Sequence, residues 1–127
     1  MKYDRIKLLL KDDFSKLKNI SLDDIGFELY DLIQRFEPYG LGNEKPLFKI
    51  TNISAKNIKY VGKEKNHLIF DVFEPNNSSK KNIKAIHFNT TYELYDNQNF
   101  ELIFEMNKST FRGKCSIELF VRKILFL

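Results

Sequence analysis

Cysteine is almost absent from this chain, and its scarcity excludes two kinds of protein. The 127 residues contain a single cysteine, Cys115. One thiol cannot form a disulfide within the chain, and it cannot supply a zinc knuckle, which needs several cysteine or histidine ligands. The two histidines, His67 and His87, belong to no cluster with metal-ligand spacing. We therefore expect a reducing, cytoplasmic location, with no metal and no cofactor bound to this chain.

Long apolar runs and catalytic motifs are also missing. No apolar run approaches the roughly 20 residues that span a bilayer. The first residues, MKYDRIKLLLKDD, have too short an apolar stretch for a signal peptide. Gly40 and Gly42 lack the preceding strand, third glycine and lysine of a phosphate loop, and no serine or cysteine stands in a nucleophile motif. The sequence thus predicts no membrane partner and no catalytic residue in this chain.

Charge is present in both signs but is unevenly distributed. Residues 1–40 carry 7 basic against 8 acidic side chains, whereas residues 41–127 carry 14 against 9, which accounts for the net charge of +4. The composition, 43% apolar and 30% charged, is that of a folded domain. A basic surface on a small domain raises the prospect of a polyanionic partner.

A helix is predicted over residues 21–37. Ser21 is a suitable N-cap, and Asp24 three residues later can complete a capping box. Pro38 disfavours a helical conformation of the residue before it and would end the helix. The apolar side chains recur at helical spacing and form one stripe: Ile25, Leu29, Leu32, Ile33 and Phe36. Upstream, RIKLLLK over residues 5–11 predicts a short strand.

After residue 46 the hydrophobic period changes to two, which predicts five strands. They cover residues 47–61 with a bend near Asn52, then 67–73, 82–88, 100–106 and 115–125. A short helix or turn is expected at TYELYDN, 91–97, and a hairpin at NKSTFRGK, 107–114, with Gly113 at positive φ. The side chains expected to point inward are Leu68, Phe70, Val72, Phe100, Leu102, Phe104, Met106, Ile117, Leu119 and Val121.

This order of elements predicts a mainly β fold, a five-stranded OB-fold Greek-key barrel preceded by an N-terminal helix. An SH3-like barrel or an open sandwich would give similar periodicity; the helix placement and the long, bent first strand favour the OB-fold. The expected organisation is a lead-in segment at 1–37, a junction at 38–46 and the barrel at 47–127. In the junction Pro38, Gly40, Gly42 and Pro46 would turn the chain from the helix into the first strand.

The junction FEPYGLGNEKPLF, residues 36–48, resembles the LEPFGPGNPEPVF-type segment of RecJ exonucleases, which are single-strand-specific nucleases of the DHH family. Downstream, GKEKNHLIFDV, IKAIHFN and FELIFEMNKSTFRGKCSIELFVRKI resemble the second, third and final strands of that family's OB domain. The resemblance covers about residues 8–125. Leu41 and Lys45 depart from it, since the family usually has proline at the first position and an acidic residue or proline at the second.

The resemblance implies that this chain is the single-stranded DNA-binding C-terminal domain of a RecJ-like 5′–3′ exonuclease that acts in DNA repair and recombination. The family's Asp-His-His triplet and glycine-rich segment have no counterpart here, so the catalytic DHH/DHHA1 core with its Mg²⁺ or Mn²⁺ would lie elsewhere in the parent protein. The OB domain would position the strand for that core. The alternative is a protein-interaction module that docks the nuclease on a partner such as the single-stranded DNA-binding protein.

OB-folds bind single strands on the face of strands two and three, between the loops that join strands one–two and four–five. The candidate binding residues are Lys59, Tyr60, Lys63, Lys65, His67, Phe73, His87, Lys108, Phe111, Arg112 and Lys114. Two rival functions remain: a module that docks the nuclease on a protein partner, and an RNA- or tRNA-binding barrel. Base stacking would make binding sensitive to Phe111 and Tyr60, whereas docking of an acidic peptide would not.

Overall fold

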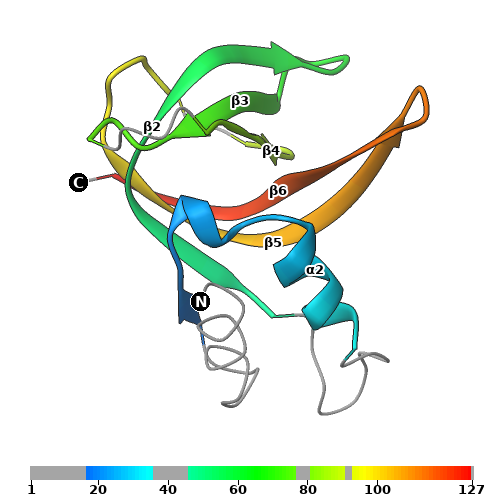
Figure 1. The fold of residues 1–127 in the computed structure, drawn as a ribbon. Coiled ribbons are helices and arrows are strands. Elements are labelled where there is room, and N and C mark those ends of the chain that lie inside the picture. The colour runs from blue at the N-terminus through cyan, green and yellow to red at the C-terminus, as the bar shows by residue number, and fades with distance from the viewer. Residues whose placement is uncertain (1–16, 36–45, 77–80, 91–92, 127) are drawn as a thin grey trace.

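The computed structural model describes residues 17–35, 46–76, 81–90 and 93–126 (Figure 1). The elements are β1 (Lys18–Asn19), η1 (Leu22–Asp24), α2 (Phe27–Gln34), β2 (Phe48–Val61), β3 (His67–Phe73), β4 (Ile83–His87), β5 (Phe100–Phe111) and β6 (Lys114–Phe126). The strand expected at 5–11, the end of the helix at 36–37 and the glycines of the junction lie outside the described residues. No helix within those residues is long and apolar enough to cross a membrane.

The strands form one six-stranded sheet in the order β1-β2-β3-β4-β6-β5, and β2 pairs with β5 as well. The sheet therefore returns to its first long strand. The β1–β2 and β4–β6 pairs are parallel, and the other pairs are antiparallel. The mainly β prediction is confirmed, but its count of five strands is too low. β1 adds a sixth, which at two residues is too short to show any hydrophobic period.

β2 bends because it carries two asparagines in the left-handed region. Asn52 has φ 55° at a register shift against β5, and Asn57 has φ 54° at a register shift against β3. Asparagine tolerates this conformation better than most residues, and such bulges increase local bending. The first part of the strand therefore pairs with β5 and the second part with β3. The predicted bend near Asn52 is confirmed.

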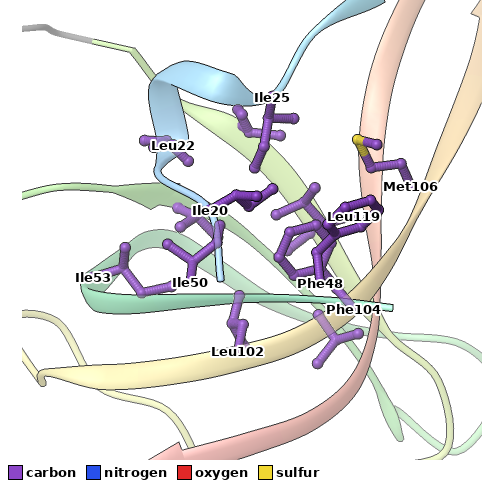
Figure 2. Packing of buried hydrophobic residues seen from close by; sticks show 14 of the residues in the cluster. Ile20, Leu22, Ile25, Phe48, Ile50, Ile53, Leu102, Phe104, Met106 and Leu119 are labelled. Atoms are coloured by element: carbon purple, nitrogen blue, oxygen red, sulfur yellow. The ribbon is translucent and has the colours of Figure 1, made fainter. Parts of the chain in front are cut away.

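The inward side of β3, β5 and β6 is the side predicted from alternation. Leu68, Phe70 and Val72 of β3 are fully buried, as are Phe100, Leu102 and Phe104 of β5. Met106, Leu119 and Val121 also lie in the core, while Ile117 is half-buried against it. Figure 2 shows how side chains from β2, β5 and β6 meet those of η1 in one cluster.

The helix predicted at 21–37 is wrong at its start. The Ser21–Asp24 capping box exists, with the Ser21 main-chain N–H donating to Asp24 Oδ2 at 2.9 Å, but it caps the 3₁₀ turn η1. Ile25 is extended (φ −81°, ψ 126°), and α2 begins only after Gly26. Glycine is the poorest helix former apart from proline, so a single glycine divides the segment. Leu22 and Ile25 still both reach the core (Figure 2).

Of the short helix or turn expected at 91–97, the structure describes residues 93–97, which contain no helix and have a turn at Asp96–Asn97. Leu94 is buried, and its main-chain N–H donates to the hydroxyl oxygen of Tyr60 at 3.0 Å. Asn97 adopts φ 64° in a turn just before β5. Leu94 is the one buried side chain among residues 93–99. A helix there would have no apolar stripe to pack on the sheet, so Leu94 alone anchors the segment.

The apolar stripe of α2 packs on the sheet. Leu29 is 0% exposed and shares the core with Phe48. We expect Leu29→Ala to lower the free energy of unfolding by about 2–5 kcal/mol, since it leaves a cavity in packed surroundings. Asp31→Ala, on the exposed side of the same helix, should change it by less than about 0.5 kcal/mol. Urea unfolding measures both, and an equally small loss in Leu29→Ala would mean that α2 is not part of the folded core.

Candidate nucleic-acid interface

The side chains that point away from the core on β3, β4 and β6 form one continuous surface, here called the outer face. Ile69 pairs with Ile86 across β3 and β4, and Ile86 pairs with Phe120 across β4 and β6. All three are half-buried, and each alternates with buried neighbours such as Ala85. Because cross-strand partners share a face, the outer face runs across three strands without interruption.

Three rings form an aromatic cluster on this face: His67, Phe88 and Phe120. The His67 and Phe88 ring centroids are 5.5 Å apart at 70°, and those of Phe88 and Phe120 are 5.5 Å apart at 82°. Both are edge-to-face contacts, the arrangement that aromatic rings favour. Phe88 lies between the other two and remains 51% exposed. An exposed ring braced on two sides is suited to stack against a planar ligand.

Two hairpins flank the outer face (Figure 1). β3 begins after the turn at 62–66, and β6 begins after the turn at Arg112–Gly113. In Figure 1 both turns project toward the right of the view, and the β5–β6 turn stands at the end of its long hairpin. Arg112 has φ 52° and Gly113 has φ 77°, values typical of a two-residue hairpin turn. The predicted hairpin with Gly113 at positive φ is confirmed.

The β5–β6 hairpin extends the outer face beyond the rest of the sheet. β5 pairs with β2 as far as Phe104, and from Glu105 onward its only partner among the described residues is β6. Phe111 pairs with Lys114 on the outward side of this arm. Phe111 is 71% exposed, and the Arg112 guanidinium carbon lies 5.1 Å from its ring centroid. The tip therefore presents an aromatic ring with two cations beside it.

The charges of the outer face favour an anionic ligand. Its carboxylates have partners: Asp71 accepts from Asn57 Nδ2 at 2.8 Å, Glu118 lies 3.6 Å from Lys84 Nζ, and Glu105 lies 3.1 Å from Arg122. The rim carries cations that have no ion-pair partner within the described ranges, and one carboxylate, Glu64, stands between two of them. These cations are Lys59, Lys63, Lys65, Arg112 and Lys114.

The structure places eight of the eleven residues singled out in the sequence on the outer face or at its rim. Lys63, Lys65 and Arg112 lie in the two turns. The others point outward from strands, as their alternation with buried residues and their cross-strand partners show: Lys59, His67, Phe73, Phe111 and Lys114. Phe73 stands at the far end of β3 from His67, where Lys56 Nζ lies 5.4 Å from its ring centroid.

Tyr60, His87 and Lys108 point to the other side of their strands, so they do not lie on the outer face. Tyr60 and His87 are both cross-strand partners of buried Leu68, and burial lowers the pKa of His87, an effect that the nearby Phe88 main chain opposes. Lys108 follows buried Met106 by two residues, and its Nζ lies 5.7 Å from the Phe27 ring centroid on α2.

Phe88 and Phe120 are the two residues that the sequence did not single out. The signal was present in the alternation of NIKAIHF, which places Phe88 on the same face as Lys84 and Ile86. Choosing that face as outward would have excluded His87 and found Phe88. Phe120 gives no such signal, because a phenylalanine between two inward residues is equally typical of a packed second layer.

The residues that the structure describes contain no group of three or more His, Cys, Asp or Glu side chains that could hold a metal ion. The outer face offers a ligand exposed aromatic rings, hydrogen-bonding groups and charges.

Comparison with known proteins agrees with this architecture. The family model of the RecJ OB domain matches residues 18–123. Two crystal structures of RecJ from Thermus thermophilus, one in complex with Mn²⁺ and one with Mg²⁺, have TM-scores of 0.59 and 0.58, each at 17% identity. The matches cover 76% and 77% of this chain but only 13% and 14% of those chains. No curated protein matches.

Proposed function

This chain belongs to the RecJ OB-domain family, and on that basis we propose that it is the single-stranded DNA-binding domain of a RecJ-like 5′–3′ exonuclease. The domain would hold the strand and position it for a catalytic core outside this chain. The ring of strands at 47–127 would act as the five-stranded OB barrel, with the segments up to residue 46 as lead-in and junction. The protein would work in the cytoplasm, in DNA repair and recombination.

The observation that supports this proposal best is the exposed aromatic cluster between two cationic hairpins. Single-stranded nucleic acid offers two features to a protein, planar bases and a regular row of phosphates. Phe88 can carry a base, and Phe111 at the hairpin tip can carry another. The rim cations attract phosphates without regard to sequence. The outer face therefore suits a single strand of unspecified sequence.

This chain spans only 13–14% of the two RecJ chains that it resembles, and we propose the activity of the longer parent protein from its family. The catalytic DHH/DHHA1 core would bind Mg²⁺ or Mn²⁺ and cleave the strand. The outer face would bind DNA next to that core. The single-stranded DNA-binding protein is a further proposed partner of the parent enzyme.

We expect Phe88→Ala to weaken binding of a fluorescent single-stranded oligonucleotide by about 1–3 kcal/mol, with little change in its salt dependence, because stacking releases no counterions. Fluorescence anisotropy at several salt concentrations measures both quantities. Phe126→Ala is the matched control. Phe126 is 40% exposed and lies at the opposite end of β6 from the hairpin turn. Its loss should leave the affinity for DNA unchanged once folding has been verified.

The same titration separates the rival functions. Absence of DNA binding by the folded wild-type chain would overturn the proposal and favour a protein-docking module. RNA of the same sequence competing better than DNA would favour an RNA-binding barrel. Equal effects of Phe88→Ala and Phe126→Ala would show that the aromatic cluster is not the binding surface.

A further inference from the structure

His67 is held with one ring nitrogen satisfied and the other available as a donor. The main-chain N–H of Asn89 donates to His67 Nδ1 at 3.1 Å. A main-chain amide can only donate, so Nδ1 must be the acceptor, and the neutral ring carries its proton on Nε2. The ring therefore offers an N–H group at the end of the outer face next to the β2–β3 turn.

The ring is fixed in this orientation by its neighbours. Gly62 has φ +97°, and a Cβ there would lie 2.6 Å from His67 Cδ2 and 3.3 Å from Nε2. Only glycine lets the ring edge that carries Nε2 lie this close to the turn. The edge-to-face contact with Phe88 holds the ring from another direction. The imidazole is thus positioned without a ligand, which lowers the entropic cost of using it.

The Asn89 turn that orients His67 is itself anchored to the start of β3. Asn66 Nδ2 donates to Asn89 Oδ1 at 3.1 Å, and the Thr90 main-chain N–H donates to the Asn66 carbonyl at 2.8 Å. Asn89 adopts φ 52°, which presents its N–H toward the ring. This set of contacts holds a donor nitrogen beside an exposed aromatic ring.

A phosphate is the acceptor that suits this place. The turn that Nε2 borders carries Lys63, Glu64 and Lys65, a net positive charge that favours an anion. Phe88, in contact with the His67 ring, is the exposed stacking surface. In a nucleotide whose base stacks on Phe88, one sugar separates the base from the phosphate. The phosphate would therefore lie near a residue that contacts Phe88, such as His67.

We propose that His67 is a phosphate-binding residue, which donates its Nε2–H to a phosphodiester oxygen while Phe88 carries the adjacent base. The inference rests on the proposed function and assigns a binding step within it. No proton is transferred. Because the imidazole is neutral in this role, the contact displaces no counterion and adds to affinity without adding to salt dependence.

Two variants at one position test the proposal. Glutamine can place an amide N–H close to the position of Nε2, whereas asparagine can accept from the Asn89 N–H but cannot reach the phosphate. We expect His67→Asn to weaken oligonucleotide binding about tenfold, as expected for a lost hydrogen bond to a charged group. His67→Gln should stay within about threefold of wild type on the same basis. Both should keep the wild-type salt slope.

The outcomes distinguish this inference from the proposed function. If wild type binds no single strand, the proposed function fails, and the role of His67 fails with it. If wild type binds and His67→Asn binds equally well, only the role of His67 is overturned. Equal losses in both variants would also overturn it and would assign His67 to support of the Asn89 turn. Nitrogen NMR of the unliganded chain supplies a second measurement, since a proton on Nδ1 in place of Nε2 contradicts the geometry.

Discussion

Replacing the five rim cations Lys59, Lys63, Lys65, Arg112 and Lys114 by glutamine should nearly abolish single-strand binding at low salt. Each phosphate contact on a single strand contributes about 0.7 to the slope of log K against log salt, so five contribute about 3.5. At about 50 mM salt this corresponds to a loss of at least about a thousandfold in affinity. The variant should therefore also show a flatter dependence of affinity on salt. A titration of wild type and variant over several salt concentrations measures this slope.

The β5–β6 hairpin supplies the control for this prediction. Lys114 pairs with Phe111 on the outward side, whereas Lys108 on the same hairpin lies over Phe27 of α2. Lys114→Gln alone should flatten the salt slope by about 0.7, and Lys108→Gln should leave it unchanged. Equal effects of the two substitutions would mean that net charge matters and the outer face does not.

The parts of the fold that could be predicted are those set by local alternation. β3 begins and ends where HLIFDVF does, and its inward residues follow directly from a period of two. The hairpin at Arg112–Gly113 follows from the need for positive φ in a two-residue turn. These features depend on residues that are close in sequence, so one sequence is enough to predict them.

The parts that could not be predicted depend on distant partners. Capping signals at Ser21 and Asp24 are the same for a 3₁₀ turn and an α-helix, and the division at Gly26 depends on where Leu22 and Ile25 find space in the core. Alternation in β4 gives two faces but does not say which is outward. The answer comes from β3 and β6, which pair with β4 on either side.

Phe104→Ala should lower the free energy of unfolding by about 3–5 kcal/mol. Phe104 is 0% exposed and pairs with Phe48, where β2 meets β5 and the sheet returns to its first long strand. Their ring centroids lie 6.2 Å apart. A cavity at this position would remove packing from both strands at once. Urea or thermal unfolding of the variant measures the loss.

Phe111→Ala, on the same strand, should have the opposite effect, with little loss of stability and weaker oligonucleotide binding. Phe111 is 71% exposed at the hairpin tip, so Phe111→Ala should change stability by less than about 0.5 kcal/mol. It should instead weaken oligonucleotide binding by about 1–3 kcal/mol if the ring stacks on a base. A folded Phe111→Ala variant with full affinity would mean that the hairpin closes the sheet and does not bind DNA. A large loss of stability in that variant would contradict the exposed position of its ring, because no core packing is removed there.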